Sequence, residues 1–220
     1  MKQEVLKALL AAKAARQPVA LVTDTKTGTQ RIVARSEAAP ESELEKAFRF
    51  DKSALVENEF YAIHNPPLRL VIIGAVLIAQ SVIPLARAVG YDVTVVDPRG
   101  AFATGARFPD VALQVEWPQD VLPGLGLDGR TAFIALTHDP KIDDVALELA
   151  LKSDAFYIGA LGSRKSHAAR LERLKAKGFD EAALARIAGP IGLSIGAVGA
   201  PEIAISILAQ MTKALRLGQL

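Results

Sequence analysis

A short glycine-rich segment followed by two cations has the residue types best suited to holding an anion. Residues 159–165 read GALGSRK and directly follow the apolar run AFYI. Gly162 permits a tight turn, and Ser163 is a residue type that often begins a helix, where free backbone N–H groups attract anions. Arg164 adds a cation where the helix macrodipole favours acids, which is unusual for a purely structural helix start. Gly162, Ser163 and Arg164 are therefore predicted to bind a phosphate or another anion, and an ordinary capped helix is the alternative.

A second turn lies at the position of a dinucleotide-binding fingerprint. Gly74 and Ala75 directly follow the apolar run LRLVII. The second glycine of such a fingerprint lets the backbone approach a pyrophosphate, and Val76 replaces it here. Gly74 and Ala75 are candidate cofactor contacts. NAD(P) binding is weakened by Val76, and a turn kept only for packing is the alternative.

Charged residues cluster after the next apolar run, YDVTVVD. Asp97 ends this run 23 residues after Gly74, where an acid normally accepts hydrogen bonds from ribose hydroxyls. An aspartate that caps a loop or helix is the alternative. Arg99 and Arg107 follow in the next loop, where an arginine is predicted to bind phosphate or else to remain a solvated surface charge.

A histidine follows the apolar run TAFIAL. His138 is predicted to contact a ligand, because the charge of an imidazole can change near neutral pH. Neighbouring residues of an extended chain point to opposite sides, so His138 and the adjacent Asp139 do not imply a catalytic pair. Asp139 is a second candidate contact, and the start of the following helix is its alternative role. No catalytic residue and no metal ligand is assigned.

These segments have the same position relative to the predicted elements, because each follows an apolar run and precedes a loop or helix. Uninterrupted apolar runs are typical of buried parallel strands. They alternate with predicted helices at 77–89, 142–152, 164–177, 181–187 and 201–215. This alternation predicts an α/β fold, a Rossmann-like parallel sheet with helices on both faces. Ligands bind such sheets beyond the carboxyl ends of the strands, where all the candidate residues fall.

The proline pair after Asn65 divides the chain into two predicted regions. Residues 1–65 are expected to form a small α+β region, with an opening helix and a hairpin whose turn is Lys26-Thr27-Gly28. Residues 66–220 are expected to form the Rossmann-like domain, because neither proline can extend a helix or a sheet ladder.

The composition excludes several classes of protein. Of the 220 residues half are hydrophobic, and 26 basic residues nearly balance 24 acidic ones. The absence of cysteine excludes disulfides, thiolate metal sites and cysteine nucleophiles. The basic residues are scattered, which argues against nucleic acid. The apolar stretches are too short to span a bilayer and the first residues do not form a signal peptide, so we expect a cytoplasmic protein without membrane contact.

Longer motifs occur in one order along the predicted domain: VTVVDPR at 93–99, FAT at 102–104, RFP at 107–109, LTHDPK at 136–141 with Asp143 and Asp144, FYIGALGSR at 156–164, PIGL at 190–193 and EIA at 202–204. Through them the chain resembles the xanthine dehydrogenase accessory factor family, also called the XdhC/CoxI group. The resemblance runs from the proline pair to near the C-terminus and implies a Rossmann-type domain.

The resemblance also implies a function. Members of this family are understood to bind molybdenum cofactor and to assist its sulfuration and insertion into molybdenum hydroxylases such as xanthine or carbon monoxide dehydrogenase. The expected role is therefore that of a non-enzymatic chaperone that binds molybdopterin transiently and acts on a molybdenum hydroxylase client. The pocket predicted from the residues suits molybdopterin, which carries a phosphate and a polar fused ring. A homodimer is implied by the resemblance alone.

The sequence departs from the family pattern in places. Leu77 and Ala188-Gly189 stand where many members have histidines, and the Gly-Gly-Cys-Val-Glu stretch of longer members does not occur. The chain therefore resembles the larger part of a split form, which would work with a separate small XdhC/CoxI-type protein. Two alternatives stay open: an NAD(P)-dependent oxidoreductase, based on Gly74 and Asp97, and an assembly module that binds no small molecule.

Overall fold

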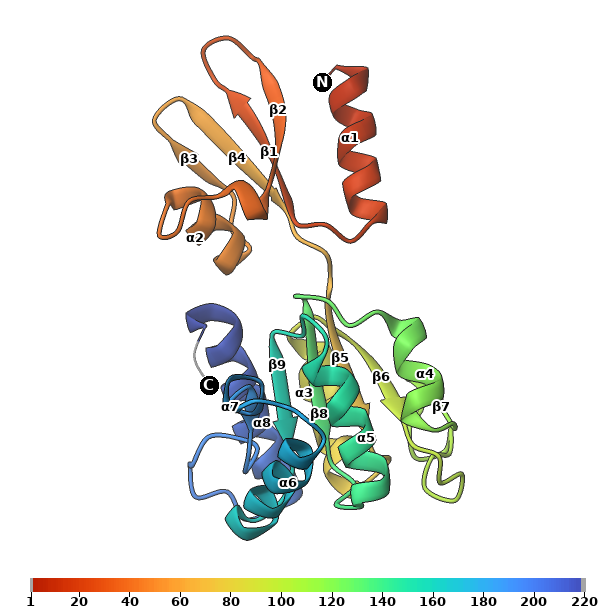
Figure 1. Cartoon of the computed structure of the whole chain (residues 1–220). Helices are drawn as coiled ribbons and strands as arrows, with labels where there is room; N and C mark the ends of the chain where they lie inside the picture. Colours follow the sequence, from red (N-terminus) through yellow and green to blue (C-terminus); the bar gives the residue numbers. More distant parts are fainter. Residues whose placement is uncertain (1, 219–220) are drawn as a thin grey trace. The chain divides into compact units, whose positions relative to one another are not determined.

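The structure is a computed structural model in which residues 2–218 are described. The chain divides into two compact units, Met1–Pro66 and Pro67–Leu220, each with its own sheet (Figure 1). None of the described helices has the length and apolar character needed to cross a membrane.

The N-terminal unit is a four-stranded antiparallel sheet with a helix on each face. Its strands have the order β2-β1-β4-β3, and their bounds are Val19–Asp24 (β1), Gln30–Ala34 (β2), Ala54–Val56 (β3) and Glu59–His64 (β4). Helix α1 is Gln3–Ala14, α2 is Glu43–Phe50, and a short 3-10 helix, η1, is Arg35–Glu37. Side chains alternate across β1, so that Val19 packs with α1 while Ala20 packs with Phe48 of α2.

The predicted hairpin of this unit is confirmed. Strands β1 and β2 are antiparallel neighbours, and Asp24 begins the turn between them. Its Oδ1 accepts hydrogen bonds from the backbone N–H groups of Lys26 and Thr27, each at 2.8 Å. An aspartate in this position stabilises a turn because its short side chain satisfies backbone donors that face away from the ladder.

The second unit is the predicted Rossmann-like domain, with a six-stranded, wholly parallel sheet of order β10-β9-β8-β5-β6-β7. The strands are Leu68–Ile73 (β5), Tyr91–Val96 (β6), Ala112–Gln114 (β7), Thr131–Ala135 (β8), Tyr157–Ala160 (β9) and Ile187–Ala188 (β10). The helices are Leu77–Ala88 (α3), Pro118–Leu125 (α4), Pro140–Leu151 (α5), Arg164–Ala176 (α6), Glu181–Leu184 (α7) and Ala200–Leu217 (α8).

Alternating side chains of the central strand divide the core of this unit into two layers. Leu70 and Ile72 of β5 face one side of the sheet, where they join buried residues of α3 and α8. Val71 and Ile73 face the other side, where they join buried residues of α4, α5 and α6. Figure 1 shows this sheet with helices on both sides. Burial on both faces explains why the strand reads as an uninterrupted apolar run.

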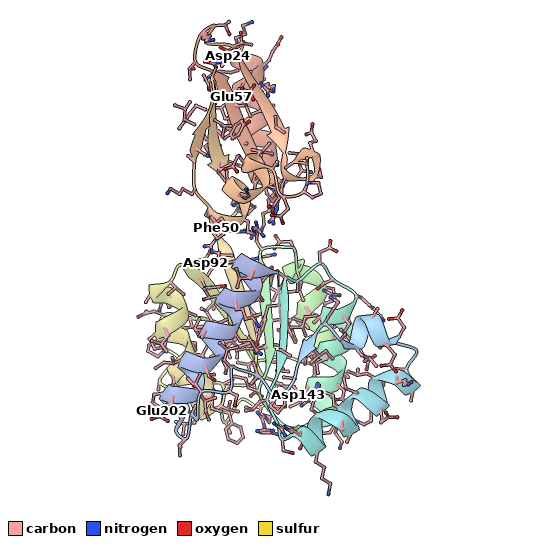
Figure 2. All side chains as sticks on the ribbon, turned by 90° about the vertical axis from the view of Figure 1, so that its left-hand side faces the viewer. Asp24, Phe50, Glu57, Asp92, Asp143 and Glu202 are labelled. Atoms are coloured by element: carbon pink, nitrogen blue, oxygen red, sulfur yellow. The ribbon has the colours of Figure 1, made fainter. Side chains whose placement is uncertain are left out.

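The strand order places the candidate residues at the end of the sheet where the parallel strands terminate, which we call the carboxyl edge. After β5, strands β6 and β7 are added on one side of it. The chain then crosses back, and β8, β9 and β10 are added on the other side of β5. This reversal beside β5 is the topological switch point, where ligands of open α/β sheets bind. In Figure 2, Asp143 lies at the end of the unit opposite Asp92, which belongs to the start of β6, so Asp143 marks the carboxyl edge.

Candidate ligand-binding site at the carboxyl edge

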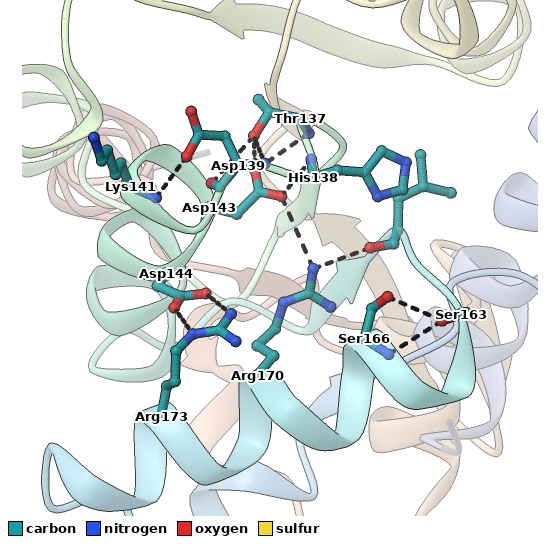
Figure 3. A network of polar contacts seen from close by, with 11 residues as sticks. Thr137, His138, Asp139, Lys141, Asp143, Asp144, Ser163, Ser166, Arg170 and Arg173 are labelled. Carbon is teal, nitrogen blue, oxygen red and sulfur yellow. Dashed lines mark hydrogen bonds and ion pairs between the residues drawn. The ribbon is translucent and has the colours of Figure 1, made fainter.

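The turn between β8 and α5 is held by one buried acid. Asp143, 1% exposed on the first turn of α5, accepts hydrogen bonds from Thr137 N (3.2 Å), Thr137 Oγ1 (2.7 Å) and His138 N (3.0 Å) (Figure 3). These bonds hold His138 at φ +65°, a left-handed conformation that is uncommon outside glycine. The His138 side chain stays exposed, as a ligand contact requires.

The two neighbouring helices begin with capping side chains. Asp139 accepts a hydrogen bond from Lys141 N at 2.9 Å, and Pro140 occupies the first position of α5. Ser163 accepts one from Ser166 N at 3.1 Å at the start of α6. Asp139 and Ser163 therefore have the capping roles that were the alternatives to ligand contact.

A pocket lies between the start of α5 and one side of α6, and we call it the α5–α6 pocket. It has a volume of about 250 Å³ and is lined by His138, Pro140, Asp143, Asp144, Ser166, Ala169, Arg170 and Arg173. The predicted Gly162 lies beside it, with φ +147°. A Cβ built at Gly162 would be 3.3 Å from Ser166 Cβ and 3.9 Å from both terminal nitrogens of Arg170, so the glycine leaves space next to the guanidinium. Arg164 is exposed on the first turn of α6 and is not among the residues that line the pocket.

Two arginines of α6 reach the pocket with different partners. Arg173 donates to both oxygens of Asp144, at 2.5 and 2.9 Å, a bidentate pair. Arg170, 4% exposed, donates from Nη2 to Leu161 O at 3.0 Å and lies 3.9 Å from Asp143 Oδ2. Among the described residues, its Nε and Nη1 have no hydrogen-bond partner. Burial lowers the pKa of Arg170 and raises that of Asp143, although hydrogen bonds to the Asp143 carboxylate oppose the rise.

Asp143 and Arg170 are the important site residues that sequence reasoning did not select. Asp143 was named only among the motifs that carry the family resemblance, without a role in ligand binding. Arg170 falls four positions before Leu174, and both are buried, so helical spacing places Arg170 on the inward stripe of α6. That spacing was the available signal, but α6 is rich in charges all round and Arg170 reads as one more solvated cation.

Asp97 is enclosed by protein donors. It is fully buried at the end of β6, where Oδ2 accepts from Ala75 N (2.7 Å) and Arg99 Nη2 (2.8 Å), and Oδ1 accepts from Arg99 N (3.0 Å) and Arg99 Nε (2.9 Å). Burial alone would raise the pKa of Asp97, but these hydrogen bonds outweigh burial and lower it. The carboxylate thus holds the β5–α3 turn and the Arg99 guanidinium together, and both its oxygens are engaged without a ribose.

Arg99 and Arg107 meet at an aromatic ring of the loop after β6. The Arg99 guanidinium lies 4.8 Å from the ring centroid of Phe102, and that of Arg107 lies 6.0 Å from it. Arg107 also donates from Nη1 to Phe102 O at 2.8 Å. It lines a second pocket of about 300 Å³ with Gln80 and Phe108, beside α3 and apart from the α5–α6 pocket.

The turns after β5 and β8 touch each other. Gly74 has φ +113°, and a Cβ built on it would lie 2.8 Å from Thr137 Cγ2 and 3.2 Å from Thr137 N. Thr137 therefore joins two clusters along the edge. Gly74, Ala75, Asp97 and Arg99 form the first, and His138, Asp139, Gly162 and Ser163 lie around the second. The structure brings eight of the ten predicted residues into these clusters, with Arg164 and Arg107 outside them.

Comparison with known proteins decides the family. Residues 70–211 match the family model described as the XdhC Rossmann domain. The chain belongs to the XdhC family. This confirms the resemblance inferred from the motifs, and the matched residues include both clusters of the carboxyl edge.

Two named relatives are similar to this XdhC chain. It is 32% identical to the molybdenum cofactor insertion chaperone PaoD of Escherichia coli K12 over 154 residues, 70% of this chain and 42% of PaoD. It is 30% identical to a probable xanthine dehydrogenase subunit of Bacillus subtilis 168 over 155 residues, 70% of this chain and 45% of that protein. The chain therefore matches less than half the length of each of these two relatives.

A solved structure is similar over nearly the whole XdhC chain. A crystal structure described as a xanthine dehydrogenase from Bacillus halodurans aligns with a TM-score of 0.68 and 26% identity, covering 97% of this chain and 64% of that one. The likeness therefore extends to the small N-terminal unit, which lies outside the residues that the family model matches.

Proposed function

We propose that this XdhC-family chain is a non-enzymatic accessory protein that binds molybdenum cofactor transiently and assists its insertion into a molybdenum hydroxylase of the xanthine or carbon monoxide dehydrogenase type. The observation that carries the proposal is the 32% identity to PaoD, whose name describes molybdenum cofactor insertion. The match to the XdhC Rossmann domain and the name of the Bacillus subtilis relative support the same role.

The donors at the carboxyl edge fit one end of this cargo. Molybdopterin carries a phosphate and a polar fused ring, and the α5–α6 pocket is lined by two arginine side chains, a residue type well suited to binding phosphate. The space beside Gly162 admits a group that a larger residue would exclude. His138, Gly162 and Ser163 would contact the cofactor at this pocket, whereas the exposed Arg164 lies outside its lining.

The first cluster would act on the cofactor through its backbone and through Arg99, and Arg107 lies outside the cluster in the following loop. The carboxylate oxygens of Asp97 already accept hydrogen bonds from Arg99 and Ala75. Asp97 would therefore hold the Gly74-Ala75 turn in place rather than accept hydrogen bonds from a ligand. Arg99 and Arg107 would offer cations along the same edge. The bound cofactor would supply the molybdenum centre of the client enzyme, while this chain holds and orients it.

A cofactor-insertion protein needs a client enzyme that receives the cofactor. The client is a molybdenum hydroxylase, and the chain acts in the cytoplasm as a homodimer, together with a separate small XdhC/CoxI-type protein.

The NAD(P)-dependent alternative is not favoured by the site. Val76 stands at the second glycine position of the fingerprint, and Asp97 has no oxygen left for a ribose hydroxyl. Binding can distinguish the two functions, because a ligand that binds only the folded protein raises its free energy of unfolding by RT ln(1 + [L]/Kd).

Thermal unfolding in the presence of each ligand tests the proposed function. Free molybdenum cofactor at a hundred times its Kd is expected to stabilise the Rossmann-like unit by about 2.7 kcal/mol, and NAD(H) or NADP(H) at the same concentration is expected to leave the melting temperature unchanged. A shift with a nicotinamide cofactor and none with molybdenum cofactor would replace the proposal by the oxidoreductase alternative. No shift with any ligand would favour an assembly module.

A further inference from the structure

A buried cation at the carboxyl edge has hydrogen-bond donors that the protein leaves unused. Arg170 is 4% exposed, and of its guanidinium nitrogens only Nη2 has a hydrogen-bond acceptor, Leu161 O. Nε and Nη1 are buried without partners among the described residues. Unsatisfied buried donors destabilise a fold, more so when the group is charged. A native protein rarely keeps such a group unless another molecule completes its hydrogen bonds.

The nearest acid does not complete them. Asp143 already accepts three hydrogen bonds, two from Thr137 and one from His138. It lies 3.9 Å from Arg170, which is beyond hydrogen-bond distance. The other acid of the pocket, Asp144, is paired through both oxygens with Arg173. Both acids are therefore committed elsewhere, and the Arg170 charge is only loosely compensated.

Further donors converge on the same pocket. Arg170 and Ser166 both line it from α6, one helical turn apart, and within residues 2–218 the exposed Ser166 hydroxyl has only the Ser163 hydroxyl as a side-chain partner (Figure 3). The space that a Cβ at Gly162 would fill lies 3.9 Å from both terminal nitrogens of Arg170.

We propose that Arg170 is the anion-binding residue of this protein, and that the α5–α6 pocket receives a phosphate monoester against its guanidinium with help from Ser166. A guanidinium binds phosphate through two parallel N–H groups, and a phosphate monoester has a further oxygen for the Ser166 hydroxyl. The exposed Arg164, which sequence analysis favoured for this role, is then a peripheral charge.

The inference rests on the proposed function only for the identity of the natural ligand, the phosphate-bearing end of molybdopterin. The anion site itself is independent of it. Calorimetric titration of the full chain with inorganic phosphate and with phenyl phosphate measures the site without any molybdenum cofactor.

We expect Arg170→Met, which keeps the length of the side chain, to weaken phenyl phosphate binding by at least about tenfold, because a charge-assisted pair is lost. Arg164→Ala is the matched control and is expected to change the affinity by less than about threefold, as for a solvated surface charge. Ser166→Ala removes an exposed hydroxyl with little risk to folding, and is expected to weaken binding by about three- to tenfold.

The results separate the inference from the proposed function. Loss of affinity with Arg170→Met and Ser166→Ala but not with Arg164→Ala supports the site, even if molybdenum cofactor itself does not bind. Equal affinity in wild type, Arg170→Met and Ser166→Ala overturns it, even if molybdenum cofactor binds well. Absence of phosphate and phenyl phosphate binding by the wild type overturns it too. If Arg170→Met does not fold, as judged by circular dichroism, the phenyl phosphate affinities of Ser166→Ala and Arg164→Ala are compared instead. Weaker binding by Ser166→Ala alone supports the site, and equal affinities overturn it.

Discussion

Asp97→Asn is expected to lower the free energy of unfolding of the Rossmann-like unit by about 2–4 kcal/mol. The carboxylate is fully buried and accepts four hydrogen bonds, three of them from Arg99. An asparagine offers one acceptor oxygen instead of two, and its NH₂ group would face donors. Arg99 is partly exposed and can turn to water, which keeps the loss below that of a fully enclosed ion pair.

Chemical denaturation of both proteins measures this difference, and Asp92→Asn is the control. Asp92 lies on the same strand but is exposed, so the same substitution there is expected to change stability by less than about 0.5 kcal/mol. A loss of similar size in the two variants would show that the four hydrogen bonds contribute little and would contradict the structural role of Asp97.

The effect of Asp97→Asn depends on pH in a defined direction. The hydrogen bonds hold the pKa of Asp97 below its ordinary value of 3.8, so its stabilisation is present above the unfolded-state pKa and is lost as pH falls through the folded-state pKa. The gap between wild type and variant should stay constant from about pH 5 to pH 8 and narrow below about pH 4. Asp143 acts in the opposite sense, because its pKa is raised by burial and its protonation favours the folded state.

Gly74→Ala is expected to destabilise the same unit by about 2–4 kcal/mol, through backbone strain and a close contact together. The new Cβ would lie 2.8 Å from Thr137 Cγ2 and 3.2 Å from the Thr137 backbone nitrogen at φ +113°. Because Thr137 joins the two clusters of the carboxyl edge, the strain would fall on the turn that carries His138. We therefore expect weaker ligand binding as well as lower stability.

Gly90→Ala separates the two causes. Gly90 has φ +90°, but a Cβ built there meets no atom within 4 Å, so only strain of about 1–2 kcal/mol is expected. Urea denaturation and ligand titration of both variants provide the comparison. If Gly90→Ala destabilises the protein as much as Gly74→Ala, the contact between the two turns has no energetic weight.

Much of the fold was predictable because strands buried on both faces have a distinctive sequence. Leu70 to Ile73 are buried on both faces of the sheet, and only an uninterrupted apolar run meets that need. The three-residue β7 and the short α4, which contains Pro123, were not predicted. An element of this length contains too few residues for a period to appear, and its structure depends on its neighbours.

The candidate site was predictable in position but less so in roles. The rule on carboxyl ends predicts that Asp97 and His138 share one edge of the sheet, and the strand order places both at that edge. The rule does not say whether an acid faces a ligand or a neighbouring arginine, and Arg99 engages both oxygens of Asp97. Arg170 was missed because its burial depends on how α6 packs beside Leu161 and Asp143, which a helix rich in charges does not reveal.

The central claim is that the carboxyl edge of the parallel sheet binds molybdenum cofactor through an anion site at Arg170 of α6. Equilibrium titration of the full chain with molybdenum cofactor tests it most directly, with wild type, Arg170→Met and Arg164→Ala measured side by side. We predict saturation at one cofactor per chain, a Kd raised at least about tenfold in Arg170→Met, and a nearly unchanged Kd in Arg164→Ala. Binding that does not saturate, or the same Kd in wild type and Arg170→Met, would contradict it.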